Sequence, residues 1–272
     1  MFAALSDFFR LARVGLTLAR HDVVFPGEYT TRLPWPGRVA GRVLRLVLGR
    51  PKGRDGERFV RALERLGPAY IKFGQFLAGR PDILGNAVTD DLARLKDKVP
   101  PFSQALAQAA LKAEFGEDAG RLFGTLPPPI AAASIAHVHR VETAEGIRAV
   151  KILRPGVEKA IALELRALKR AARLLEARTP DARRLRPVDF IETVGRSLEL
   201  ELDLRLEAGA ASEFAERARA HGYFTSPEPD WSRTSKRVLT TDWVEGTPLT
   251  APQALSREGL DRPALASAVT RG

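Results

Sequence analysis

The spacing of apolar residues predicts that most of the chain is helical. Between residues 57 and 79, apolar side chains recur every three or four positions, which is typical of a helix with one buried face. Gly67 and Pro68 interrupt this stretch, and we expect them to bend or restart the helix. The same spacing predicts further helical segments at Leu92–Leu95, Ser103–Phe115, Val157–Ala177 and Val188–Ala220.

The middle of the chain is rich in β-forming residues instead. Two short runs, Ile135–Val141 and Ile147–Leu153, are joined by the four residues 143–146, which predicts a β-hairpin. A last strand pair is expected around Tyr223–Thr225 and Arg237–Val244. The chain is therefore predicted to have an α+β fold with a small antiparallel sheet.

The N-terminal region alternates apolar and basic residues. Residues 2–20 predict an amphipathic helix, and residues 38–48 form a second stretch of the same kind. Two interpretations stay open, since both stretches could lie on an anionic membrane surface or pack on the domain as ordinary surface helices. No window of 18 uncharged apolar residues exists, so no segment of this chain is expected to span a bilayer.

Charge and composition narrow the function classes. The chain has 43 Lys and Arg against 33 Asp and Glu, a net charge of +10, and no cysteine. The missing cysteines exclude disulfides, thiolate metal sites and Cys nucleophiles. Eleven basic residues face five acidic ones in residues 1–60, so much of the excess charge lies there. This asymmetry favours a negatively charged neighbour, such as a membrane surface, a nucleic acid or a nucleotide.

The predicted hairpin carries a variant of the protein-kinase nucleotide loop. Ala131, Ala133 and Ala136 occupy the three glycine positions of that loop, and Val138 occupies its valine position. Lys151 ends the run Arg-Ala-Val-Lys, where a kinase carries its phosphate-binding lysine. Because alanine has a Cβ, the loop cannot bring its N–H groups as close to phosphates as glycines would. The plain alternative is a hairpin that merely contains small residues.

A series of ordered blocks across residues 66–246 resembles the UbiB/ABC1/ADCK atypical kinase-like family. They are the Lys-x-Gly-Gln motif within Leu66–Gln75, Arg80–Leu84, Asp97–Phe102, the alanine-rich loop Pro129–His139, and the Glu-x-Asp helix Glu201–Ala208 followed by the hinge Val238–Gly246. Two residues depart from the family pattern: His137 stands where glutamine is expected, and Ala210 stands where many bacterial members have asparagine.

The resemblance implies the N-terminal part of an atypical protein-kinase-like fold. It consists of an N-lobe with a small antiparallel sheet and a family-specific helical extension, with most of the C-lobe missing. The implied domains are a basic amphipathic extension, a Lys-x-Gly-Gln helical subdomain, the kinase-like N-lobe and the start of the C-lobe, at residues 1–56, 57–126, 127–246 and 247–272. The chain contains no kinase catalytic loop and no D-F-G motif after the hinge, so it is not expected to turn over ATP alone.

The resemblance also assigns site residues. The catalytic set is Lys72, Gln75, Glu201 and Asp203. The nucleotide contacts are Ile130, Ala131, Ala132, Ala133, Ser134, Ile135, Ala136, His137, Val138, Lys151, Glu207, Trp243 and Val244, with Glu207 as the partner of Lys151.

Helix geometry refines this assignment. On a straight helix, Asp203 and Glu207 share a face, whereas Glu201 lies about 160° away from Asp203. We therefore expect Asp203 and Glu207 to face the nucleotide. Glu201 is expected to face the helices that carry Lys72 and Gln75.

Function and partners follow from the same resemblance. The implied activity is that of an ATP-binding atypical kinase or ATPase that supports ubiquinone biosynthesis at the cytoplasmic face of the bacterial inner membrane. ATP or ADP with Mg²⁺ is the implied cofactor, and prenylated quinone precursors or ubiquinone-biosynthesis proteins are the implied partners. The alternative is a non-catalytic nucleotide-binding scaffold. Bacterial members are often labelled 2-polyprenylphenol 6-hydroxylase, but the sequence has no flavin fingerprint or haem cysteine.

Two further features have structural alternatives. His137 and His139 lie two apart on a strand and share a face, which could hold a metal or form a hydrogen-bonded structural pair, and no third ligand is identifiable nearby. The Arg-rich segment 166–186 is most simply a solvated helix face, because the chain has no nucleic-acid module and few aromatic residues. No metal site and no nucleic-acid partner are therefore predicted.

Overall fold

The computed structural model divides into two compact units, which are described separately. It describes residues 2–23, 52–93, 95, 101–178, 180–222, 225–247 and 260–271. The first unit consists of Met1–Pro100, Ala132–Ile135 and Gly156–Glu199. The second consists of Pro101–Ala131, Ala136–Pro155 and Leu200–Gly272. Each unit therefore combines segments far apart in sequence, and the boundaries predicted at residues 56, 126 and 246 stay predictions.

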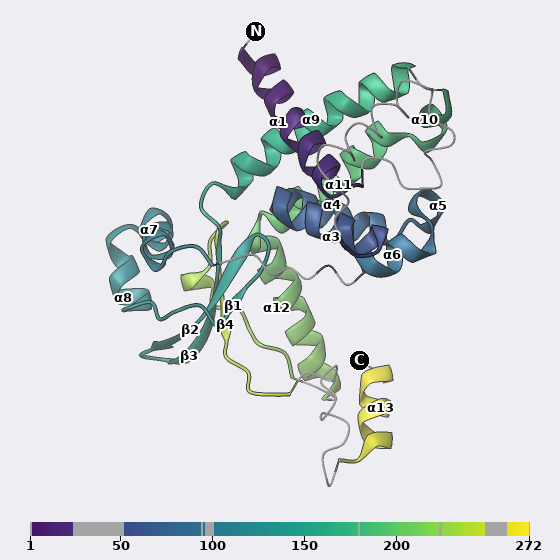
Figure 1. Cartoon of the computed structure of the whole chain (residues 1–272). Coiled ribbons are helices and arrows are strands. Elements are labelled where there is room, and N and C mark those ends of the chain that lie inside the picture. The colour runs from purple at the N-terminus through teal and green to yellow at the C-terminus, as the bar shows by residue number, and fades with distance from the viewer. Residues whose placement is uncertain are drawn as a thin grey trace. The chain divides into compact units, whose positions relative to one another are not determined.

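The first unit is made of helices (Figure 1). They are α1 (Phe2–Arg20), α3 (Asp55–Leu66), α4 (Pro68–Ala78), α5 (Pro81–Leu84), α6 (Asn86–Leu92), α9 (Val157–Arg178), α10 (Pro180–Leu185) and α11 (Pro187–Glu201). The expected interruption of the 57–79 helix is confirmed. Gly67 has φ of 108° and separates α3 from α4, which starts with Pro68 at its first position. Proline is tolerated there because the first helical N–H needs no intrahelical partner.

Helix α1 is amphipathic, as predicted, but its charged side is the one that packs. The carboxylate of Asp7 is inaccessible to solvent and accepts hydrogen bonds from Nε and Nη2 of Arg166 on α9, at 3.0 and 2.7 Å. The bond from Arg166 holds the pKa of Asp7 below its ordinary value despite burial. The exposed side carries the large apolar residues Leu5, Phe8, Phe9 and Leu16. The second basic stretch, residues 38–48, lies outside the described residues.

The second unit is a small sheet with helices on both faces (Figure 1). Its elements are α7 (Gln104–Phe115), η1 (Gly116–Asp118), α8 (Ala119–Phe123), β1 (Ala131–Ala132), β2 (Ala136–Thr143), β3 (Gly146–Leu153), α12 (Leu204–His221), η2 (Trp231–Arg233), β4 (Val238–Asp242) and α13 (Arg262–Arg271). The strand order is β1-β2-β3-β4, and β3 is antiparallel to both β2 and β4. The predicted α+β fold class is confirmed.

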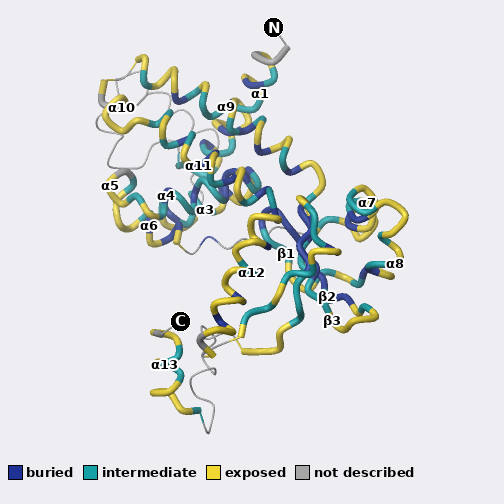
Figure 2. Tube along the Cα trace, turned by 180° about the vertical axis from the view of Figure 1, so that it is seen from behind, coloured by how far each residue is buried: buried dark blue, intermediate teal, exposed yellow. Residues whose placement is uncertain are grey.

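One face of the sheet forms the core of the second unit. Val141 of β2, Val150 and Ile152 of β3 and Val238 of β4 pack with Ala107 and Leu111 of α7, Phe123 of α8, and Leu126. These strand positions alternate along each strand, as a sheet with a buried face requires. Figure 2 shows the resulting buried stretches along β2 and β3. Lys151 and Leu239 lie on the other face, where α12 packs.

Two predicted elements differ from the structure in detail. The hairpin connection has two residues rather than four, because Thr143 and Gly146 still pair across β2 and β3. Gly146 has φ of 123°, a conformation that suits glycine. The strand predicted at Arg237–Val244 is confirmed as β4. It pairs with β3, whereas most of its expected partner, Tyr223–Thr225, lies outside the described residues.

The single helix predicted at Val188–Ala220 is wrong. Helix α11 ends at Glu201 and α12 begins at Leu204, with Asp203 in an extended conformation between them. The amide of Leu204 donates to the carbonyl of Lys236 at 2.9 Å instead of continuing the helix. Leu202 and Leu204 are both buried. A tertiary hydrogen bond and two buried leucines therefore override a continuous helical pattern.

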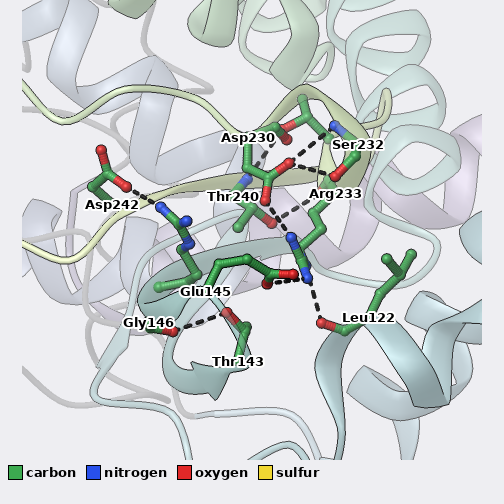
Figure 3. A network of polar contacts seen from close by, with 11 residues as sticks. Leu122, Thr143, Glu145, Gly146, Asp230, Ser232, Arg233, Thr240 and Asp242 are labelled. Carbon is green, nitrogen blue, oxygen red and sulfur yellow. Dashed lines mark hydrogen bonds and ion pairs between the residues drawn. The ribbon is translucent and has the colours of Figure 1, made fainter.

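The turn of the hairpin is fixed by one buried arginine (Figure 3). Arg233 of η2 donates to Asp230 at 2.6 Å, to Glu145 in the β2–β3 turn at 2.6 Å, and to the carbonyl of Leu122 in α8 at 3.1 Å. Only 10% of its side chain is exposed. Arg148 and Asp242 form a further ion pair between β3 and β4. These contacts join the hairpin to α8 and to the residues that precede β4.

Replacing this arginine tests the role of the network in folding. Arg233→Met removes the donor to Oδ2 of Asp230, to Glu145 and to the Leu122 carbonyl, and we expect the free energy of unfolding to fall by about 2–3 kcal/mol. Urea denaturation measures this change. Arg121→Met is the matched control, because Arg121 is 73% exposed and pairs with an exposed Asp118. The control should cost less than about 0.5 kcal/mol, and equal losses in the two variants would contradict the assigned role.

Candidate functional site

The candidate site is centred on an ion pair between a strand and a helix. The Nζ of Lys151 on β3 donates to both carboxylate oxygens of Glu207 on α12, at 2.9 and 2.7 Å. The two residues are 56 positions apart in sequence. The Lys151 side chain is 28% exposed and that of Glu207 is 49% exposed. The pair is therefore partly shielded yet still accessible from solvent.

The start of α12 determines where Glu207 lies. Asp203 caps this helix by accepting a hydrogen bond from the amide of Arg205. Leu204 and Ala208 are buried and lie one turn apart on the packed face. Glu207 is next to Ala208 in the first turn, at the edge of that face. The cap and the two buried residues thus hold the carboxylate beside β3.

Apolar residues surround Lys151 on its face of the sheet. Val138 of β2 and Leu239 of β4 are its direct cross-strand partners, so their side chains lie on the same face. Ala149 is two residues before Lys151 and shares that face. Val138 and Ala149 are half-buried, whereas Ala136, expected to cover an adenine, is fully buried. Part of the sheet face near Lys151 is therefore accessible to solvent.

His137 and His139 lie on the opposite face and are fully buried. The ring of His137 stacks on Phe102 with centroids 3.6 Å apart, and its Nε2 accepts from the Phe102 amide at 3.2 Å. His139 bonds to the carbonyl of Pro127 through Nδ1 at 2.8 Å. Burial lowers the pKa of both residues, that of His137 to about 4, so both are neutral at pH 7.

These contacts favour the structural interpretation of the histidine pair. Because His137 Nε2 accepts a hydrogen bond from the Phe102 amide, the hydrogen of the neutral ring is on Nδ1, which is not a metal ligand in this tautomer. No group of three or more His, Cys, Asp or Glu residues suited to a metal occurs in the part of the chain that the structure describes. The side chain of His137 thus belongs to the core, on the face away from Lys151.

The alanine-rich loop adopts only ordinary backbone conformations. Ala131 and Ala132 form β1, and the only described non-glycine residues with positive φ are Asp22 and Arg186. The alanines of this loop therefore avoid the left-handed region, where a Cβ is strained. Ser134 is 1% exposed, and its Oγ has no hydrogen-bond partner within the described residues. Ile135 is buried as well, while Ile130 at the start of the loop is 53% exposed.

The predicted hinge, Val238–Gly246, begins with β4 and continues beyond its end. The amide of Trp243 donates to the carbonyl of Ile147 at 3.2 Å, which continues the pairing beyond the strand. The indole Nε1 donates to Glu245 at 2.6 Å, and the guanidinium of Arg140 lies 5.7 Å from the centroid of the Trp243 ring. Val244 is 59% exposed. The two hinge residues thus leave the sheet at its β3–β4 side.

The Lys-x-Gly-Gln motif lies on α4 in the first unit. A Cβ on Gly74 would clash with Cδ1 of Leu63 and with Cδ1 of Leu95, so the glycine permits close packing of α4 on its neighbours. Lys72 lies about 200° around the helix from Gly74, away from this contact. Lys72 and Gln75 are half-buried. Their predicted approach to Glu201 stays a prediction, because they belong to a different unit.

The geometric argument for Asp203 was wrong in its premise. Asp203 is not inside a helix, so it does not share a helical face with Glu207. Its carboxylate accepts from Nε and Nη2 of Arg205, at 2.9 and 2.6 Å. The Arg205 bond lowers the pKa of Asp203. Asp203 is therefore a helix cap held by a neighbouring arginine, and Glu201 is half-buried at the end of α11.

Sequence reasoning missed the residues that support the site. Arg233 contacts Glu145 and Leu122, and Phe102, although it ends a quoted block, contacts His137; these partners are far away in sequence, so no local pattern predicts the contacts. Gly74 stands inside a quoted motif, but only the neighbouring Leu63 and Leu95 explain why the residue is glycine. Asp230 and Arg233 have the three-residue spacing of a short helical turn, which was the one available signal.

The comparisons with known proteins agree on one family. A family model described as an ABC1 atypical kinase-like domain matches residues 94–271. Proteins named "Probable protein kinase UbiB" are similar to the chain. The one from Marinobacter nauticus is 36% identical over 218 residues, which are 79% of this chain and 40% of that protein. Those from Cellvibrio japonicus and Aeromonas hydrophila are 35% and 34% identical over 266 residues each.

The chain spans about half the length of the curated relatives that it matches. The aligned region covers 95% of this chain and 47% of the Cellvibrio protein, and 96% and 48% for the Aeromonas protein. No described helix has the length and apolar character needed to cross a membrane.

The capping role of Asp203 can be tested by two substitutions. Asp203→Ala removes the cap of α12, and we expect a loss of about 1 kcal/mol in the free energy of unfolding. Asp203→Asn should retain most of it, because asparagine also caps helices. The lowered pKa of Asp203 makes its ionic contribution complete above the ordinary value of 3.8, and this contribution is lost as the pH falls below that value.

Urea denaturation at several pH values measures both effects. The difference between the wild type and Asp203→Asn should shrink on acidification. An alanine variant as stable as the wild type at pH 7 would contradict the capping role.

Proposed function

The chain belongs to the ABC1 atypical kinase-like family, and on this premise we propose that it contributes the nucleotide-binding lobe of an atypical kinase or ATPase. The observation that carries the proposal is the ion pair between Lys151 and Glu207. Kinases need such a pair because the lysine at the α/β-phosphates must be held by a fixed counter-charge. The nucleotide is ATP or ADP, and its phosphates replace part of the solvent around Lys151.

The proposed nucleotide site uses the face of the sheet that carries Lys151. Val138 and Ala136 lie on the adenine side, and the hinge residues Trp243 and Val244 lie at the end of β4. The family resemblance assigns the alanine-rich loop from Ile130 to Ile135 to the phosphates. None of these residues has a positive φ, so the amides of such a loop approach phosphates less closely than those of a glycine loop. The Oγ of Ser134 is buried and has no hydrogen-bond partner within the described residues. His137 contributes through its backbone only.

The described residues fit a phosphate better than they fit Mg²⁺. Magnesium takes oxygen ligands and is usually held by one or two carboxylates together with substrate phosphates. Asp203 is engaged by Arg205, and the described residues contain no cluster of three acidic or histidine side chains. We therefore assign no residue of this chain to Mg²⁺ and derive no transfer step from it. Catalysis is proposed for the whole protein.

A non-catalytic scaffold is the alternative function. The engagement of Asp203 by Arg205 favours it, because a carboxylate held in this way is not ready to coordinate a metal. In both versions the biological role proposed is support of ubiquinone biosynthesis, with prenylated quinone precursors or the enzymes that modify them as partners. The roles proposed for Lys72, Gln75 and Glu201 near the nucleotide rest on the family resemblance alone. Phosphate release by the full-length protein, stimulated by such lipids, separates the enzyme from the scaffold.

We further propose that α1 docks on an anionic membrane surface at the cytoplasmic face. On the charged side of α1, Asp7, Arg10 and Arg13 form hydrogen bonds with residues of α9. This leaves Phe8 and Phe9 each 63% exposed, with Leu5 and Leu16 beside them. Exposed aromatic and aliphatic side chains flanked by arginines are suited to the boundary between headgroups and acyl chains. The role is peripheral.

The nucleotide proposal is tested by ligand-induced thermal stabilisation. ATP or ADP at 100 times its dissociation constant should stabilise the chain by about 2.7 kcal/mol. Lys151→Met should abolish this gain, while Lys112→Met should retain it because that lysine is 68% exposed on α7. Equal stabilisation of the wild type and Lys151→Met by nucleotide would contradict the site.

The membrane proposal is tested by flotation with vesicles that contain phosphatidylglycerol. Replacing Phe8 and Phe9 together by serine should weaken vesicle binding by about tenfold or more, because two inserted aromatic side chains are lost. Leu106→Ser is the control, since Leu106 is 49% exposed but lies on α7 in the other unit. Unchanged flotation of the double variant would rule out α1 as the docking element.

A further inference from the structure

A cavity inside the first unit has the lining of a ligand site. It measures about 210 Å³ and lies among α1, α3, α4 and α9. Its apolar wall consists of Leu66, Pro68, Ala69, Val157, Ala160 and Ile161. Its polar end consists of Arg13, Tyr70 and Glu164. Such a combination of an apolar wall and a few converging polar groups is typical of small-molecule sites.

The polar end is positive rather than negative. Glu164 is 7% exposed, and both of its oxygens are engaged. Oε1 accepts from Arg10 at 2.8 Å and from Arg13 at 3.1 Å, while Oε2 accepts from the hydroxyl of Tyr70 at 2.5 Å. Two guanidinium groups therefore compensate one carboxylate. A cationic ligand would find no available carboxylate oxygen, whereas an anionic one would be attracted.

Arg13 is placed to meet an anion at the mouth of the cavity. Its Nη2 donates to Glu164 and to the carbonyl of Leu66 at 3.4 Å, and half of its side chain is exposed. Both of these contacts are made by Nη2 of the guanidinium. A guanidinium held in this way can bind a carboxylate or phosphate with geometric specificity. The neighbouring pairs of Asp7 with Arg166 and Arg170 add to the surplus of positive charge.

The volume limits the size of the ligand. An apolar cavity of about 150 Å³ accepts benzene, whereas pockets for drug-sized molecules start at about 300 Å³. A cavity of about 210 Å³ therefore suits a single ring or a short chain. Its apolar walls would take the chain and Arg13 would take the charged end.

We propose that this cavity binds a small amphiphile that has one anionic group, with its apolar part between α4 and α9 and its anion on Arg13. None of the residues that line the cavity is among those assigned to the proposed nucleotide site. The ligand chemistry is that of a short-chain fatty carboxylate or of the end of an anionic lipid. A ligand in this cavity contacts α1, α4 and α9 together, because Arg13, Tyr70 and Glu164 all line it.

Octanoate is the probe, and calorimetric titration of the chain is the measurement. Octanoate has about ten heavy atoms, so a dissociation constant on the order of 1 mM or tighter is expected. Arg13→Gln should weaken octanoate binding by about tenfold while leaving octan-1-ol binding unchanged, because only the charged ligand uses the guanidinium. Ala160→Phe should abolish binding of both ligands, since Ala160 is exposed at the wall and the added ring occupies the mouth.

Ala162→Phe is the matched control for folding and surface change. Ala162 is exposed on the same helix but does not line the cavity, so this variant should bind octanoate like the wild type. Octanoate binding that survives Ala160→Phe, or no binding at millimolar concentration, would overturn the proposal. Vesicle flotation separates the two ligand sources: Ala160→Phe should weaken it only if the occupant is the end of a membrane lipid, and should leave it unchanged for a free carboxylate. Nucleotide stabilisation reports on the other site and is unaffected in all these outcomes.

Discussion

The position at which α12 begins is the constraint on which the candidate site depends. The ion pair of Lys151 and Glu207 forms only if the first turn of α12 lies beside β3. The hydrogen bond from the Leu204 amide to the Lys236 carbonyl and the cap formed by Asp203 end α11 and start α12 at this place. A continuous helix through Asp203 would rotate and displace Glu207. Two backbone-level interactions thus position the charge on which nucleotide binding is proposed to depend.

The two faces of the sheet have different roles: one forms the core and the other carries the candidate site. Its one face packs Val141, Val150 and Ile152 against α7 and α8, and its other face carries Lys151. Because successive side chains point to opposite faces, a change in register by one residue would bury the lysine and expose the core. The Arg233 network and the Arg148–Asp242 pair hold the hairpin in its register. The stacking of Phe102 on His137 ties the segment before α7 to the same strand.

Features that depend on neighbouring residues could be predicted from the sequence, whereas features that depend on residues far away in the sequence could not. The break at Gly67–Pro68 and the hairpin were predictable, because backbone preferences alone define them. The end of α11 was not, since it depends on Lys236, more than 30 residues away. The amphipathic character of α1 was evident in its residues. The side of α1 that packs could not be predicted, because it depends on the ion pair between Asp7 and Arg166 of α9. The pairing of Lys151 with Glu207 came from the family resemblance and not from periodicity.

The central claim is that the face of the sheet with Lys151 and Glu207 receives the nucleotide. Hydrogen–deuterium exchange of the chain with and without Mg-ATP tests it most directly, because it locates the ligand without any substitution. The account predicts slower exchange in Ala136–Thr143, Gly146–Leu153 and the first turns of α12. Protection confined to α7 and α8, or no change in β3 and α12 at saturating nucleotide, would contradict it.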